Sequence, residues 1–207
     1  ALPAQDFARV EHHLREIKVV LIKGMISDDL AFVRIAKEYL TMADLKWIRD
    51  RRIGQDKIGG KAAGIVLASR ILQRVAGESR LSPVKFTIPE SFFICSDVFY
   101  EFLALNNLSY YVNQKYKPVE HIESEYPQLQ QAYLRGRLPD HVVTRLRQIL
   151  TQVNGQPLIV RSSSLLEDNF ATSFAGKYDS VFCANQGSPE QNLADLIQAI
   201  VRVYASV

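Results

Sequence analysis

The chain has 207 residues, enough to bury one substantial hydrophobic core or one domain with an added helical segment. Its 47% hydrophobic and 23% charged content is ordinary for a globular protein, and a formal net charge of +3 is too small to indicate nucleic-acid binding. The sequence shows no secretory leader pattern and no apolar run long enough to span a membrane, so we expect no membrane association.

The first part of the chain, from residue 6 to residue 53, is predicted to be wholly helical. Apolar residues at 7–21 recur every three or four positions, which places them on one helical face. A Ser-Asp-Asp signal at 27–29 caps a second helix, and the capping-box pattern of Thr41 and Asp44 begins a third. We therefore expect residues 1–53 to form a helical extension that packs on the next domain, mediates dimerisation or docks a further domain.

Two glycines and a lysine precede the next predicted helix. Gly59, Gly60 and Lys61 belong to a motif at 58–65 that directly precedes a stretch at 66–75 whose apolar residues have helical spacing. The first amides of a helix and its dipole attract anions, and Lys61 would add a positive charge for a phosphate group. The spacing is not that of a Walker A loop. The alternative is that Gly60 only permits a tight turn and that Lys61 is solvated.

Helices and strands alternate through the rest of the chain. We predict an extended link at 82–89, a strand at 92–95, a helix to about residue 105 capped by Ser96 or Asp97, a loop at 106–118, helices at 122–135 and 139–153, a strand ending at Arg161, a strand at 178–183, and a helix beginning at Ser188 and Pro189. Cys95 and Cys183 lie in apolar, strand-like runs. We expect them to be buried thiols outside any disulfide, which fits a cytoplasmic protein.

The stretch at 159–176 carries the most informative chemistry. A β-branched run ends at Arg161, and three serines follow. Arginine pairs with phosphate in a bidentate manner, and hydroxyl groups can bind the same anion. The acidic pair at 167–168 could hold Mg²⁺, and the small-residue turn at 173–176 could bring backbone amides close to a ligand. This pattern favours a nucleotide. The alternative is a strand end at which Arg161 pairs only with a neighbouring carboxylate.

Together, the two motifs resemble the N-terminal nucleotide-binding domain of the pyruvate phosphate dikinase and phosphoenolpyruvate synthase family. The resemblance covers residues 54–207 and implies the first lobe of an ATP-grasp fold. The expected class is therefore α+β, a small sheet with packed helices preceded by the helical segment 1–53. One position departs from the family pattern: Gly64 stands where an asparagine usually follows the lysine by three residues.

The resemblance also implies a set of site residues. Lys61 and Arg161 would contact the phosphates of ATP and contribute to catalysis. The implied nucleotide-binding residues are Gly59, Gly60, Lys61, Arg161, Ser162, Ser163, Glu167, Asp168, Ser173, Phe174, Ala175 and Gly176. Mg²⁺ is expected to accompany ATP, although no residue is assigned as a metal ligand. None of the four histidines is assigned to catalysis.

The reaction implied by the resemblance is phosphoryl transfer from ATP to pyruvate through a phosphohistidine carrier. In that family a second ATP-grasp lobe and a phosphohistidine domain complete the enzyme, so we expect this chain alone to bind ATP weakly and to lack turnover. Two alternatives stay open. The same lobe could serve a dikinase with another acceptor, such as an antibiotic or a glucan, or the chain could be a non-catalytic interaction module that keeps the fold. A homodimer also stays open.

Overall fold

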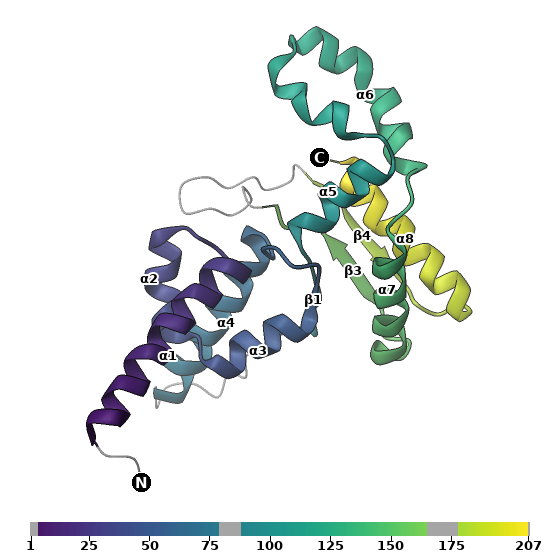
Figure 1. Cartoon of the computed structure of the whole chain (residues 1–207). Coiled ribbons are helices and arrows are strands. Elements are labelled where there is room, and N and C mark those ends of the chain that lie inside the picture. Colours follow the sequence, from purple (N-terminus) through teal and green to yellow (C-terminus); the bar gives the residue numbers. More distant parts are fainter. Residues whose placement is uncertain (1–3, 79–87, 165–177, 207) are drawn as a thin grey trace. The chain divides into compact units, whose positions relative to one another are not determined.

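The computed structural model describes residues 4–78, 88–164 and 178–206, and these residues divide into two compact units. The first unit contains the described residues up to Ser96, together with Ser163 and Ser164. The second contains 97–162 and 178–206. Among the described residues, helices predominate in both units and each unit has one two-stranded sheet (Figure 1). This combination is compatible with the predicted α+β class.

Helices make up most of the first unit. Its elements are α1 (Ala4–Met25), α2 (Leu30–Tyr39), α3 (Met42–Arg51), β1 (Arg52–Ile53), α4 (Gly60–Glu78) and β2 (Phe93–Ile94). The Asp29 carboxylate accepts a hydrogen bond from the Phe32 amide at 2.7 Å and caps α2. Thr41 and Asp44 form a capping box at the start of α3. Both predicted helix starts are confirmed.

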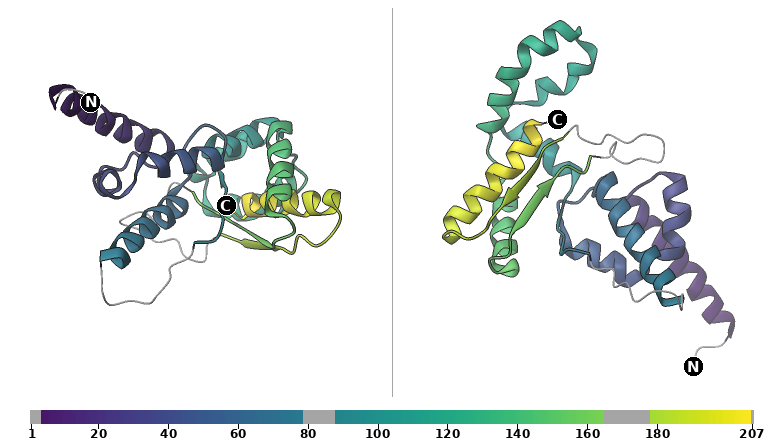
Figure 2. Two further views of the ribbon diagram at one scale, coloured as in Figure 1. Left: turned by 90° about the horizontal axis from the view of Figure 1, so that it is seen from below. Right: turned by 180° about the vertical axis from the view of Figure 1, so that it is seen from behind.

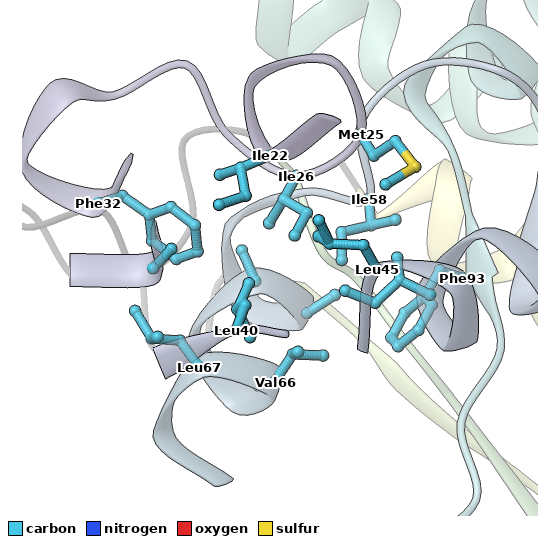
Figure 3. Close-up of a cluster of buried hydrophobic side chains, with 14 of the residues drawn as sticks. Ile22, Met25, Ile26, Phe32, Leu40, Leu45, Ile58, Val66, Leu67 and Phe93 are labelled. Atoms are coloured by element: carbon cyan, nitrogen blue, oxygen red, sulfur yellow. The ribbon is translucent and has the colours of Figure 1, made fainter. Parts of the chain in front are cut away.

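One hydrophobic core joins the four described helices of the first unit and β2 (Figure 3). Ile22 from α1 and Ile48 from α3 are fully buried, and Ile58 and Phe93 join them from segments that follow α3. Each aliphatic side chain buried in this way contributes about 1.5–3 kcal/mol of hydrophobic stabilisation. The described helices before residue 54 therefore share a core with residues after it, while the domain boundary at that position stays a prediction.

A short parallel sheet corrects the prediction that residues 6–53 are wholly helical. Arg52 and Ile53 form β1, which pairs with β2 in the register Arg52 to Phe93 and Ile53 to Ile94. The Cys95 amide extends the pairing by donating to the Ile53 carbonyl at 2.9 Å. A strand of two residues is too short to show the alternation that predicts strands, so the sequence pattern could not reveal it.

The second unit combines helices with an antiparallel sheet. Its elements are α5 (Ser96–Leu105), η1 (Ser109–Tyr116), α6 (Val119–Leu134), α7 (Asp140–Val153), β3 (Leu158–Arg161), β4 (Ser180–Cys183) and α8 (Pro189–Ala205). The Ser188 hydroxyl accepts from the Gln191 amide and caps α8, as predicted. The predicted loop at 106–118 is wrong in part, because η1 is a 3₁₀ helix. The Tyr111 amide donates to the Leu108 carbonyl, three residues back, at its start.

Helix α8 packs against both strands of the antiparallel sheet and against α6 and α7 (Figure 2). Strands β3 and β4 pair from Leu158 opposite Cys183 to Arg161 opposite Ser180. Side chains alternate between the two faces of the sheet: Leu158, Val160, Val181 and Cys183 are buried or half-buried, whereas the residues between them are exposed. The sheet thus has one packed face and one outer face.

The two cysteines agree with a further expectation. Cys95 and Cys183, both in the described part of the chain, are buried, and neither forms a disulfide. Burial raises the pKa of the Cys183 thiol, so this thiol stays protonated and unreactive near neutral pH. Within 4–78, 88–164 and 178–206, every helix is too short or too polar to cross a membrane.

Candidate functional site

The two sequence motifs meet inside the first unit, although about a hundred residues separate them. The Ser163 hydroxyl accepts a hydrogen bond from the Ala62 amide at 2.9 Å and donates one to the Ile58 carbonyl at 3.1 Å. The backbone carbonyl of Ser164 accepts from the Gly60 amide at 2.9 Å. Three hydrogen bonds therefore attach the serine pair to the start of α4.

These bonds cap α4 from a distant part of the chain. The first amides of a helix have no partner within the helix, and a serine oxygen placed just before the helix commonly satisfies one of them. Here Ser163 and Ser164 supply the acceptors for Ala62 and Gly60. Neither of these two amides is free in the structure, which differs from the expectation of free amides at this helix end. The assignment of Gly59 and Gly60 as nucleotide-binding residues stays a prediction.

Gly59 is the residue that allows the serine pair to come so close. Its φ of +82° lies in the left-handed region that residues with a side chain rarely adopt. A Cβ atom at this position would lie 1.5 Å from the Ser163 carbonyl oxygen, far inside any permitted contact. The backbone of the serine motif therefore occupies the space that a side chain at Gly59 would need.

The segment before Gly59 is held in place by contacts that the sequence analysis missed. The Ile58 amide donates to the Met25 carbonyl at 3.2 Å, and the Ser96 amide donates to the Lys57 carbonyl at 3.1 Å. The Ser96 hydroxyl donates to Asp56 Oδ2 at 2.6 Å and holds the pKa of that carboxyl below its usual value. Because forty residues separate Asp56 from Ser96, no local sequence signal indicates this pair.

The two predicted cationic residues lie in different units. Lys61 is in the first turn of α4, and its side chain is half-buried. Arg161 is the last residue of β3, on the exposed outer face of the sheet. In sequence, Arg161 is separated from Ser163 by Ser162 alone, which is half-buried. The strand that carries the arginine thus leads directly into the serine pair that caps α4.

A family model for the pyruvate phosphate dikinase AMP/ATP-binding domain matches residues 55–207, which is well over half of the chain. The chain belongs to this family. The comparisons with curated proteins and with solved structures gave no match. Family membership confirms the predicted resemblance and identifies a nucleotide-binding domain of a phosphotransferase family.

Both motifs of this pyruvate phosphate dikinase AMP/ATP-binding domain fall within the matched region. The structure describes the first motif in full and the second only as far as residue 164. The predicted site residues that lie outside the described residues are Glu167, Asp168, Ser173, Phe174, Ala175 and Gly176. Within the described residues, no group of three or more His, Cys, Asp or Glu side chains could hold a metal ion. The assignment of exposed Arg161 as a nucleotide-binding residue stays a prediction.

Proposed function

We propose that this chain is the nucleotide-binding part of an ATP-dependent phosphotransferase that resembles phosphoenolpyruvate synthase and pyruvate phosphate dikinase. One observation carries the proposal: Ser163, from the arginine–serine motif, is bonded to the turn that begins at Gly59, inside a region that matches an AMP/ATP-binding domain. Two motifs with phosphate-binding chemistry in one matched domain support a nucleotide more strongly than either motif alone. The proposal includes the first lobe of an ATP-grasp fold and a cytoplasmic location.

In this proposal, the cationic residues stabilise negative charge on the phosphates. Lys61 provides a point charge beside the first turn of α4, and Arg161 provides a planar guanidinium that can bind two phosphate oxygens. Phosphoryl transfer depends chiefly on positioning and electrostatic stabilisation, which such groups supply. Ser163 acts as a positioning residue, because its hydrogen bonds fix the backbone on both sides of Gly59 and Gly60.

Residues outside the described ranges, and further domains, are also proposed to take part in the transfer. The turn at 173–176 is proposed to fold over the phosphates, with Glu167 and Asp168 shaping the same loop and Mg²⁺ arriving bound to ATP. When bound, Mg²⁺ would neutralise phosphate charge. A second ATP-grasp lobe and a phosphohistidine domain of the same protein are proposed to complete the transfer to pyruvate.

The proposal is tested by titrating the chain with ATP and MgCl₂ while following backbone amide shifts by NMR. We expect shifts at Gly60, Lys61 and Arg161, and we expect Lys61→Ala and Arg161→Ala each to weaken binding about tenfold or more, because each removes a charge-assisted hydrogen bond. Saturating ATP that moves no amide in either motif would contradict the proposal.

Matched controls separate a local phosphate contact from a general loss of positive charge. Lys46 is exposed on α3 in the first unit, and Arg147 is exposed on α7 in the second. Lys46→Ala and Arg147→Ala therefore change the net charge as much as the site variants do, in the same units. The proposal expects affinity for ATP to stay within about twofold in both controls, since separated surface charges are screened by salt.

A further inference from the structure

The first half of α1 carries an apolar stripe that lies outside the core of the first unit. Val10 and Leu14 are 48% and 47% exposed, and Ile17 is half-buried. The second half of α1 supplies the core instead, through the buried side chains of Ile22 and Met25. The first turns of α1 extend beyond the other helices of the unit (Figure 1). In a single chain, this stripe therefore remains largely in contact with water.

The stripe is narrow and follows a heptad repeat. Val10, Leu14, Ile17 and Leu21 are spaced by four, three and four residues, so Leu14 and Leu21 occupy a positions and Val10 and Ile17 occupy d positions. Apart from Leu14, the residues between Val10 and Ile17 are polar and exposed. A helix that covers a globular core normally presents a wider apolar face, whereas a stripe limited to a and d positions is typical of a coiled-coil seam. Leu21 packs against the core, so the seam begins at the core and runs toward the start of the helix.

We propose that α1 mediates a homodimer in which this seam packs against the same seam of a second copy of the chain in antiparallel orientation. The inference is independent of the proposed nucleotide-binding function. In the proposed register, Leu14 packs against Ile17 of the second copy, and Val10 packs against Leu21 of the second copy. Because the dimer has two-fold symmetry, each of these layers occurs twice, and the seam contains four layers.

The charges beside the seam favour the antiparallel orientation. Glu11 and Lys18 both follow a d residue and therefore occupy e positions. Residues at e and g positions form the ion pairs between coiled-coil helices, and in an antiparallel pair an e position faces an e position. In the proposed register, Glu11 faces Lys18 of the second copy, and symmetry forms this pair twice. In a parallel pair, e positions face g positions, so Lys18 would face His13 and would gain no opposite charge.

The apolar side chains of the seam also disfavour a parallel pair. Parallel two-stranded coiled coils favour β-branched residues at a and leucine at d. Here the order is reversed, with Leu14 and Leu21 at a and with Val10 and Ile17 at d. In an antiparallel pair every layer combines an a residue with a d residue, so each leucine packs against a β-branched side chain.

The local contacts of Glu11 and Lys18 are compatible with this pairing. Lys18 Nζ donates to the Leu40 carbonyl at 3.2 Å, and an ammonium group carries three donors. Glu11 Oε1 accepts from Arg15 at 2.6 Å, and a carboxylate accepts several hydrogen bonds. The bond to Leu40 holds the ammonium of half-buried Lys18 beside the seam, which reduces the entropy lost when the pair forms.

The length of the seam predicts a weak and reversible dimer. Residues 10–21 span about 17 Å along a helix that rises about 1.5 Å per residue. Four layers over this length make a small interface, from which the cost of association must be subtracted. We therefore expect a Kd on the order of 10–100 μM.

Sedimentation equilibrium of the whole chain tests the seam, at concentrations from about 5 to about 500 μM, which bracket the expected Kd. Leu14→Gln should weaken the dimer about tenfold or more, because it removes a leucine from two layers and keeps a good helix former. Leu72→Gln is the matched control, because Leu72 is a leucine of similar exposure, 42%, on α4 of the same unit. The control should leave the Kd within about twofold of wild type.

Charge reversal tests the register. Glu11→Lys and Lys18→Glu each replace two attractive contacts of the dimer by two repulsive ones, so each variant alone should associate about threefold or more weakly. In an equal mixture of the two variants, the lysines of one variant face the glutamates of the other in both contacts. The mixture should therefore associate nearly as strongly as wild type. Because the contacts within each chain are the same before and after mixing, recovery reports on the contacts between chains.

Four results would overturn the proposal. Wild type that stays monomeric at about 500 μM would show that the seam does not bind a second copy. A tetramer would contradict a two-stranded seam. Weakening by Leu72→Gln as large as that by Leu14→Gln would place the interface outside α1. A mixture of Glu11→Lys and Lys18→Glu that associates no more strongly than either variant alone would exclude the antiparallel register.

Discussion

Gly59 and Ser163 approach so closely that a Cβ atom on the glycine would lie 1.5 Å from the serine carbonyl oxygen. The same serine bonds through its hydroxyl to Ile58 and Ala62, on either side of the glycine pair. The contact therefore has two complementary parts. Gly59 contributes a left-handed φ, and Ser163 contributes a bridging hydroxyl. Changing either part should loosen the attachment of the serine pair to α4.

Gly59→Ala should destabilise the first unit. An alanine would meet both the backbone strain of a positive φ and the overlap with Ser163, which together should lower the free energy of unfolding by about 2 kcal/mol or more. Urea unfolding followed by the fluorescence of Trp47 measures this, because Trp47 is the single tryptophan and lies on α3 of the first unit, next to Phe93.

Gly64→Ala is the control, and it should raise the free energy of unfolding where Gly59→Ala lowers it. Gly64 is exposed within α4, and an added Cβ would meet no atom within 4 Å. Alanine is favoured over glycine inside a helix, so the free energy of unfolding should rise by about 0.5–1 kcal/mol. Equal destabilisation by both substitutions would show that the contact with Ser163 is not what makes Gly59 necessary.

Ser163→Ala should remove the cap on α4 without adding any atom. The Ala62 amide would lose its acceptor and the Ile58 carbonyl its donor, at a cost of about 1–2 kcal/mol in the free energy of unfolding. Trp47 fluorescence in urea again measures the effect. Ser124→Ala serves for comparison, because the exposed Ser124 hydroxyl only bonds to a carbonyl three residues back in α6. A similar loss in both variants would contradict a special role for Ser163.

Helix ends were predictable from the sequence because their determinants are local. Asp29 bonds to an amide three residues ahead, and Thr41 and Asp44 satisfy each other over the same distance. The strand β1 was not predictable, because its stability comes from pairing with β2, about forty residues later. The 3₁₀ helix η1 was missed for a different reason: its Asn- and Tyr-rich sequence resembles that of a loop.

The candidate site shows the same division between local and distant determinants. Residue types alone indicate Gly59, Lys61 and Arg161 as candidate site residues. Glycines before a helix, and cations near hydroxyl groups, are typical of phosphate-binding sites. Ser163 caps α4 through a contact between residues about a hundred positions apart in the sequence. The local sequence pattern cannot indicate such a contact, and it therefore predicts free amides at the start of α4. For Ile159 and Phe182 the sequence predicts only that each lies in a strand. Which side chains point outward cannot be assigned before the packed side of the sheet is known.

Gly136→Ala should destabilise the second unit by overpacking its aromatic cluster. A Cβ on Gly136 would lie 2.5 Å from the ring of Phe102, which is fully buried and in contact with the rings of Tyr133 and Tyr204. The free energy of unfolding of this unit should fall by about 1–3 kcal/mol. Amide hydrogen exchange should become faster in α6 and α8. Gly24→Ala on α1, where a Cβ meets nothing within 4 Å, should leave those rates unchanged.

The hydrogen bond between Ser96 and Asp56 should make the stability of the first unit depend on pH. The Ser96 hydroxyl is the main cause that lowers the pKa of Asp56 below its usual value of 3.8, with smaller contributions from Lys57 and Arg52. A pKa that is lower in the folded than in the unfolded state gives stability that is present above about pH 4 and is lost as the pH falls through the folded-state pKa.

Ser96→Ala should therefore raise the pKa of Asp56 toward 3.8, and acid should then reduce the stability of the variant less than that of wild type. An NMR titration of the Asp56 carboxyl carbon measures the pKa directly. Urea unfolding between about pH 2.5 and about pH 6, a range that spans the usual carboxyl pKa values, measures the stability. Ser91→Ala is the control, because the Ser91 hydroxyl donates to the Pro89 carbonyl and not to a carboxylate. An unchanged Asp56 pKa in Ser96→Ala would assign the shift to Lys57 and Arg52 instead, since their positive charges favour the ionised carboxylate without the hydroxyl.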